Sequence, residues 1–228
     1  MANNVESKLL LLNCTFAETG IKRLNDLFTK IFNQYNINFT IKHLTEEINN
    51  IDEFTHLIIS GSALFVSQEN KNDQKIYDIV QQFNSKSILG ICYGHQILAK
   101  ALMNENICRK SRTPELGWRK VELADNQLFA GISKPVFYES HLEEIFNLNN
   151  DFTIIATNSK CDIQGYQYKN LPIWGVQFHP EVTIEYGKQS IKNKLVNNIE
   201  LENIFYNELN DHIDIDQNFK IFENFANS

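Results

Sequence analysis

The feature that most constrains the fold is an alternation of apolar runs and amphipathic stretches in the first hundred residues. The apolar runs that are typical of strands lie at residues 8–13, 38–42, 56–60 and 87–90. Apolar side chains recur at helical spacing in residues 20–35, 71–83 and 96–103. Strands that alternate with helices favour a parallel sheet covered on both faces and joined by right-handed crossovers.

The chain beyond Met103 has a different texture. Shorter strand-like segments separated by turn residues lie at 119–123, 136–139, 153–156, 164–168 and 173–178. We therefore predict an α/β fold with a mostly parallel central sheet flanked by helices and an antiparallel extension. We expect residues 1–228 to form a single domain, with residues 190–228 as a helical C-terminal tail packed on it.

Composition and charge narrow the possible functions. The 228 residues are 43% hydrophobic, which excludes global disorder, and 21 Lys and Arg against 28 Asp and Glu give a net charge of −7. This acidic balance argues against nucleic acid as a partner. No apolar run approaches the roughly 20 residues of a membrane-spanning helix, and residues 1–8 lack the pattern of a signal peptide. We expect a cytoplasmic protein with no membrane partner.

One segment carries a clear signal for chemistry, the run SILGICYGHQ at residues 87–96. A strand that ends in Gly-x-Cys-x-Gly and continues into a helix is the cysteine form of a nucleophile elbow. Gly90 and Gly94 leave room for the sharp turn, and the helix N-terminus behind Cys92 favours a thiolate. A buried core cysteine is the alternative interpretation. Cys14, Cys108 and Cys161 lack such a context, and we interpret them as structural.

A base for this nucleophile is offered by WGVQFHPE at residues 174–181. His179 follows an apolar strand that Pro180 interrupts, and Glu181 is close enough in sequence to orient the imidazole. Cys92, His179 and Glu181 are therefore candidate nucleophile, base and orienting group. Each of the latter two, taken alone, could equally be an ordinary polar residue.

Together the two segments resemble the class I glutamine amidotransferases, which hydrolyse glutamine through a Cys-His-Glu triad. GICYGHQ at 90–96 and GVQFHPEV at 175–182 look like family signatures in the expected order. Within the family the similarity is greatest to the glutaminase domain of GMP synthase, because of the ICYG elbow, the Ser140-His141 pair and HPEVTIEYGK at 179–188. The resemblance implies a flavodoxin-like α/β fold, L-glutamine as substrate and no cofactor or metal.

The resemblance also implies roles for individual residues. Cys92 would form a γ-glutamyl thioester, and His179 would transfer protons with Glu181 behind it. The backbone amides of Gly61 and Tyr93 match the family's oxyanion hole. Three further side chains match the segments that hold the substrate glutamine: Gln96, Ser140 and His141.

Two departures from the family pattern leave alternatives open. The loop Ser62–Val66 lacks the second glycine and the proline that are usual in GMP synthases. No P-loop or ATP-pyrophosphatase segment is present, so we expect that ammonia passes to a separate acceptor or synthetase partner. The element ELGW at 115–118 resembles free-standing amidotransferase-like proteins. The alternatives are a γ-glutamyl hydrolase or peptidase on the same scaffold, and a partner-activated protein that is inactive alone.

Overall fold

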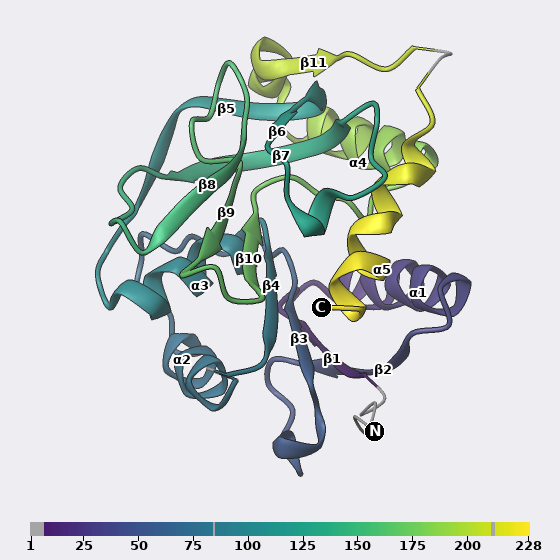
Figure 1. Ribbon diagram of the computed structural model, residues 1–228. Helices are drawn as coiled ribbons and strands as arrows, with labels where there is room; N and C mark the ends of the chain where they lie inside the picture. Colours follow the sequence, from purple (N-terminus) through teal and green to yellow (C-terminus); the bar gives the residue numbers. More distant parts are fainter. Residues whose placement is uncertain (1–6, 84, 211–212) are drawn as a thin grey trace.

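The computed structural model describes residues 7–83, 85–210 and 213–228 and has an eight-stranded mixed sheet at its centre (Figure 1). The order of its strands is β2-β1-β3-β4-β10-β9-β8-β6. The first half of the chain supplies β1 (Lys8–Asn13), α1 (Glu18–Gln34), β2 (Asn38–His43), β3 (His56–Ile59), α2 (Asp73–Gln82), β4 (Ser87–Ile91) and α3 (Tyr93–Met103). The predicted α/β alternation is confirmed.

The second half of the chain completes this sheet and builds a smaller one. Its elements are β5 (Cys108–Lys120), β6 (Glu122–Leu123), β7 (Val136–Ile145), β8 (Phe152–Thr157), β9 (Gly165–Tyr168), β10 (Ile173–Val176), α4 (Ile184–Asn197), β11 (Phe205–Asn207) and α5 (Lys220–Ala226). Strands β2, β1, β3, β4 and β10 are parallel. Strands β9, β8 and β6 continue the sheet in antiparallel pairs, as predicted.

Both faces of the parallel sheet are buried, which explains why its strands read as continuous apolar runs. Alternate residues of β1 point to opposite faces. Leu9 and Leu11 pack in a cluster with Phe28 of α1, whereas Leu10 and Leu12 belong to a second cluster that includes side chains of α2 and α3. The helices therefore cover the sheet on both sides (Figure 1).

Residues 108–118 are a strand that the sequence patterns did not predict. Strand β5 pairs antiparallel with β7 and parallel with β11, forming a separate three-stranded sheet. Its first half is rich in charged residues and has no apolar alternation, and its pairing register shifts between Lys110 and Glu115. Pairing with β7, rather than an apolar face, defines this part of the strand, so pattern-based reasoning does not detect it.

The expectation of a uniformly helical tail needs correction. Helix α4 ends at Asn197, and short 3₁₀ turns and β11 follow before the chain becomes α-helical again at Lys220. The Asn198 side chain accepts a hydrogen bond of 3.0 Å from the backbone amide of Glu200. Asparagine side chains that bond to nearby backbone in this way favour caps and turns over continuous helix.

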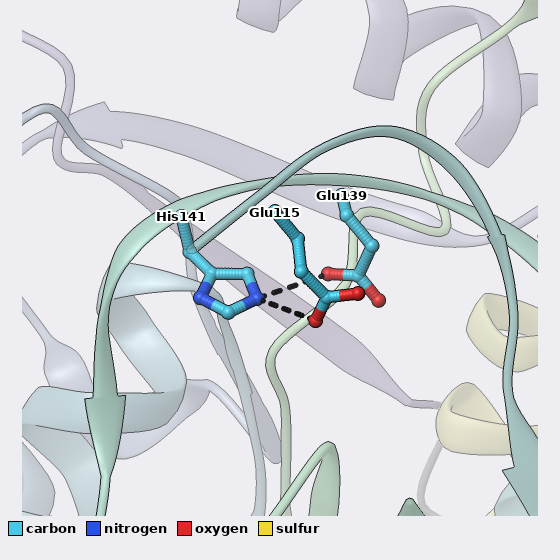
Figure 2. Close-up of side chains that lie close together, drawn as sticks. All are labelled: Glu115, Glu139 and His141. Carbon is cyan, nitrogen blue, oxygen red and sulfur yellow. Dashed lines mark hydrogen bonds and ion pairs between the residues drawn. The ribbon is translucent and has the colours of Figure 1, made fainter. Parts of the chain in front are cut away.

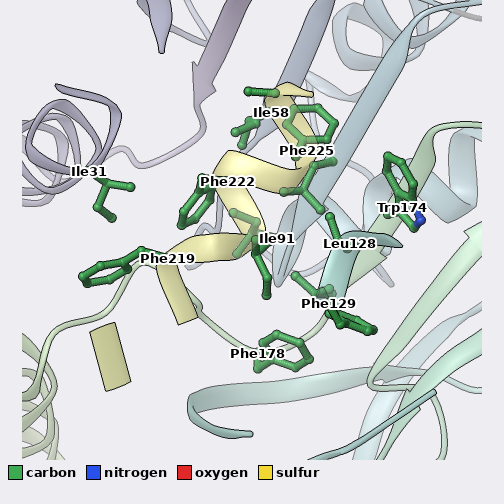
Figure 3. Packing of buried hydrophobic residues seen from close by; sticks show 14 of the residues in the cluster. Ile31, Ile58, Ile91, Leu128, Phe129, Trp174, Phe178, Phe219, Phe222 and Phe225 are labelled. Atoms are coloured by element: carbon green, nitrogen blue, oxygen red, sulfur yellow. The ribbon is translucent and has the colours of Figure 1, made fainter. Parts of the chain in front are cut away.

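The end of the tail is part of the main core, as Figure 3 shows. Phe222 and Phe225 of α5 are fully buried. The Phe222 ring lies 5.4 Å from that of Phe28, and the Phe225 ring lies 6.2 Å from that of Trp174 in β10. That residues 1–228 form one domain stays a prediction. No helix among the described residues is long and apolar enough to span a membrane.

Candidate active site

The strand order brings three predicted site residues to one edge of the sheet. Strands β3, β4 and β10 are neighbours and run parallel. Gly61 follows β3, Cys92 follows β4, and His179 follows β10. In open α/β sheets this carboxyl edge is where ligands bind.

Cys92 occupies a strained corner between β4 and α3. Its backbone has φ 52° and ψ −104°, a conformation that is costly for a residue with a side chain. The glycines on either side are required: a Cβ on Gly90 would lie 2.4 Å from the Gly94 carbonyl oxygen, and one on Gly94 would lie 2.0 Å from the Ile59 carbonyl oxygen. The elbow therefore packs tightly against β3.

The imidazole of His179 lies between Cys92 and Glu181. His179 Nδ1 is 2.8 Å from Glu181 Oε1, and the His179 backbone amide donates to the Tyr138 carbonyl at 2.8 Å. Burial by itself would lower the pKa of His179, but the Glu181 carboxylate and the Cys92 sulfur outweigh it and raise the pKa well above its usual range. This electrostatic environment favours the protonated imidazolium form of His179.

Two small cavities meet at Cys92. One of about 170 Å³ is lined by Tyr93, Gln96, Ser140 and other residues, and the second, of about 180 Å³, also has Gly61, His179 and Glu181 in its wall. A Cβ on Gly61 would lie 2.9 Å from His179 Cε1 and 3.6 Å from Cys92 Cβ. Only a residue without a side chain fits between them.

Comparison with known proteins identifies the family of this chain. The model of class I glutamine amidotransferases matches residues 23–198, which include the elbow and the His-Pro-Glu segment. The chain belongs to the class I glutamine amidotransferases. As members of that family are, it is a glutamine amidotransferase enzyme.

The relatives of this amidotransferase include subunits of GMP synthase. It is 34% identical over 146 residues to a glutamine-hydrolyzing GMP synthase subunit from Thermoplasma acidophilum, covering 63% of this chain and 72% of the relative. It is 36% identical over 141 residues to the protein of the same name from Pyrococcus furiosus, covering 60% and 72%. A solved glutamine amidotransferase from Thermotoga maritima, 22% identical, shares the fold with a TM-score of 0.74 over 98% of this chain and 99% of the other.

The three residues predicted to hold substrate line the same cavity of the amidotransferase, but their polar groups differ in how far they are already hydrogen-bonded within the protein. Gln96 Nε2 donates to the Glu143 carbonyl at 3.0 Å and to Gln177 Oε1 at 2.8 Å, so its amide hydrogens are occupied. The Ser140 carbonyl oxygen lies 4.0 Å from Cys92 Sγ. Both ring nitrogens of His141 face protein groups, with Nδ1 3.0 Å from the Glu143 carbonyl. A substrate contact through the His141 ring is therefore disfavoured.

Several residues around the cavities were not predicted from the sequence. Gln177 Nε2 lies 3.5 Å from Cys92 Sγ, and Lys194 Nζ donates to Ser140 Oγ at 2.6 Å. Glu143 Oε2 accepts from the backbone amide of Val66 at 2.7 Å and from that of Ser67 at 3.2 Å. Gln177 lies inside the GVQFHPEV motif and could have been noticed. Glu143 and Lys194 carry no local signal, because only the tertiary fold brings them here.

The environments of the other three cysteines disfavour the reactive thiolate form. Cys14, Cys108 and Cys161 are all buried. Burial raises the pKa of both Cys14 and Cys108 to about 12 and also raises the pKa of Cys161. Thiols of this kind react slowly with electrophiles, so Cys92 is the thiol expected to react first.

A buried cluster of Glu115, Glu139 and His141 lies behind the site, between β5 and β7 (Figure 2). His141 Nε2 is 3.1 Å from Glu115 Oε2 and 3.6 Å from Glu139 Oε2. Burial, and to a smaller degree the Glu115 carboxylate, raise the pKa of Glu139 well above its usual range. These ligand atoms could hold a cation, but Glu115 already accepts hydrogen bonds from Asn158 and Gln164. The raised pKa of Glu139 favours the protonated form of its carboxyl group.

Proposed function

We propose that this amidotransferase hydrolyses L-glutamine to glutamate and ammonia through a γ-glutamyl thioester on Cys92. The observation that carries the proposal is the arrangement of Cys92, His179 and Glu181 around a small cavity at the carboxyl edge of the sheet. A cavity of this size suits an amino acid better than a macromolecule. The family membership supports the same substrate class.

In the first step the Cys92 thiolate attacks the side-chain amide carbon of glutamine. The carbonyl π electrons move to oxygen, and the backbone amides of Gly61 and Tyr93 are the proposed donors to that oxyanion. Tyr93 is the first residue of α3, so its amide is among those that an α-helix leaves without an intrahelical acceptor. The His179 imidazolium then protonates the nitrogen, the carbon–nitrogen bond breaks, and ammonia leaves.

In the second step water attacks the thioester. His179, now neutral, takes a proton from the water, and the carbon–sulfur bond breaks to give glutamate and the thiolate. Glu181, bonded to Nδ1, keeps the other ring nitrogen directed toward Cys92 and stabilises the imidazolium in both steps. We further propose a separate acceptor for the ammonia, such as a synthetase partner, because relatives are named as glutamine-hydrolyzing subunits of GMP synthase.

The test is glutamate release from L-glutamine by the purified chain. We expect turnover by the native chain and a loss of at least about a thousandfold in Cys92→Ala. Cys161→Ala, which removes a buried thiol that lines neither cavity beside Cys92, is the matched control. γ-Glutamyl dipeptides offered as alternative substrates would identify a γ-glutamyl hydrolase if they were preferred over glutamine. Undiminished turnover in Cys92→Ala would overturn the proposed mechanism.

A further inference from the structure

Lys194 of α4 reaches the cavities beside Cys92. Its Nζ donates to Ser140 Oγ at 2.6 Å, and the side chain lines both the 170 Å³ and the 180 Å³ cavity. Ser140 in turn has its carbonyl oxygen 4.0 Å from Cys92 Sγ. Only Ser140 therefore separates the Lys194 ammonium group from the Cys92 sulfur.

No carboxylate in the walls of the two cavities is available to neutralise the positive charge of Lys194. Both carboxylates in the cavity walls have other partners, since Glu143 accepts from Val66 and Ser67 and Glu181 faces His179. Lys194 forms no ion pair within the described part of the chain. The other wall residues of the 170 Å³ cavity include Ala63, Leu64, Phe65 and Leu142, which cannot neutralise it.

The environment of the ammonium makes an anionic ligand favourable. Although the Lys194 residue as a whole is exposed, desolvation of its ammonium lowers its pKa, with the Cys92 sulfur acting in the opposite direction. A partly desolvated cation gains more from a carboxylate than a fully hydrated one does. Charge-assisted hydrogen bonds of this kind are also shorter and stronger than neutral ones.

We propose that Lys194, together with the Ser140 hydroxyl, binds a carboxylate group of the substrate. The inference rests on the proposed function for the identity of the substrate, and it adds a specificity-determining residue to that site. Two sources could supply the carboxylate. One is the α-carboxylate of the glutamyl group, and the other is a carboxylate on the group that leaves the γ-carbon.

The experiment compares substrates that differ only in the carboxylate. For the first source, kcat/KM is measured for L-glutamine and for its α-carboxamide. For the second, it is measured for γ-glutamylglycine and for γ-glutamylethylamide, which lacks the leaving-group carboxylate. The variants are Lys194→Met and Lys194→Arg, with Lys192→Met as the control because Lys192 is on the same helix but lines a different groove.

We expect Lys194→Met to lower kcat/KM about tenfold more for the carboxylate-bearing member of one pair than for its neutral analogue. The pair that responds identifies the source. Lys194→Arg should retain part of the discrimination, and Lys192→Met should retain all of it. If Lys194 only supported the fold, Lys194→Met would lower kcat/KM equally for both members of each pair, and that result would overturn the inference.

A second readout separates this inference from the proposed function. The rates at which iodoacetate and iodoacetamide alkylate Cys92 are measured by mass spectrometry of the peptide that contains it, and need no turnover. We expect the ratio of the iodoacetate rate to the iodoacetamide rate to fall several-fold in Lys194→Met and to stay constant in Lys192→Met. Absence of glutamine turnover with a falling ratio would refute the proposed function alone. An unchanged ratio without turnover would refute the Lys194 inference.

Discussion

Glu181 shows how one side chain sets the chemistry of its neighbour. Its carboxylate is buried, lies 2.8 Å from His179 Nδ1, and helps to raise the pKa of His179 well above its usual range. The elevated pKa favours the protonated form of the imidazole beside the Cys92 sulfur. In the proposed mechanism, this imidazolium is the group that protonates the leaving nitrogen.

Replacing Glu181 with Gln tests this electrostatic role. The amide removes the negative charge, so the pKa of His179 falls, and the pH at which the imidazolium loses its proton moves down. We expect the basic limb of the kcat/KM profile to move to lower pH and kcat to drop about a hundredfold. The measurement is a pH profile of glutamate release. A basic limb at the same pH as in the native chain would contradict this role for Glu181.

Gly61 can be tested through its lack of a side chain. In Gly61→Ala the new Cβ would lie 2.9 Å from His179 Cε1, so either the imidazole or the loop must shift. We expect kcat to fall about a hundredfold, as when an oxyanion-hole donor is lost. The melting temperature, measured in parallel, should change by only a few degrees. An unchanged kcat would exclude Gly61 from the proposed oxyanion hole.

At the scale of elements, strand β7 does most to shape the site. It carries Tyr138, which pairs with His179, then Ser140 in the cavity wall, and Glu143, which binds the loop after β3. One strand thus contacts His179, the cavity beside Cys92 and the loop that follows Gly61. The loop Ser62–Val66 lacks the second glycine and the proline that are usual in GMP synthases, but hydrogen bonds still anchor its end. Glu143 accepts from the successive backbone amides of Val66 and Ser67.

Removal of the Glu143 carboxylate is predicted to destabilise the loop that it anchors. In Glu143→Ala the amides of Val66 and Ser67 lose their acceptor, and Val66 is buried. We expect the free energy of unfolding to fall by about 2 kcal/mol, and amide hydrogen exchange at Val66 and Ser67 to accelerate. Glu69→Ala, at an exposed position just beyond the loop, should change neither. Unchanged exchange in Glu143→Ala would refute the anchoring role.

The elements of the parallel sheet were predictable because strands that are buried on both faces consist of continuous apolar residues. The elbow and the His-Pro-Glu segment were predictable as local motifs, and the structure brings Cys92, His179 and Glu181 together; their catalytic roles stay predictions. Strand β5 was not predictable, because pairing rather than an apolar pattern defines it. Lys194 was not predicted as a site residue because it is 54 positions from Ser140 in the sequence, and only the fold brings the two together.

At the scale of the whole molecule, pH should affect stability through Glu139. Its pKa is raised in the folded state, so the folded chain holds a proton that the unfolded chain releases above its ordinary pKa. The free energy of unfolding should therefore fall as the pH rises from that ordinary value through the folded-state pKa.

The variant that tests this is Glu139→Gln, which keeps the shape and cannot ionise. We expect it to be more stable than the native chain at pH 9 and to show a weaker decline in stability between pH 5 and pH 9. Urea unfolding at several pH values measures both. Glu47→Gln, at an exposed position, is the control. Equal pH dependence in Glu139→Gln and the native chain would show that Glu139 does not hold the proton.

The C-terminal helix should matter to the stability of the entire chain. Phe222 is fully buried against Phe28 and Phe32 of α1. Phe222→Ala is expected to lower the free energy of unfolding by about 3–5 kcal/mol, through lost burial and the cavity left behind. Val196→Ala, at a side chain 78% exposed, should change it by less than about 0.5 kcal/mol. Denaturant titration compares the two, and equal effects would mean that α5 packs only loosely.

The position of the last residue has a practical consequence. Ser228 Oγ donates to Ser87 Oγ at 3.0 Å, and Ser87 is the first residue of β4, whereas Cys92 follows the last. At about 3.3 Å per strand residue, Ser87 and Cys92 lie roughly 16 Å apart, at opposite ends of β4. A molecule immobilised on a sensor surface through a tag attached at Ser228 would thus turn the Cys92 cavities toward solution. Binding of small ligands or of a second protein could then be recorded without obstruction by the support.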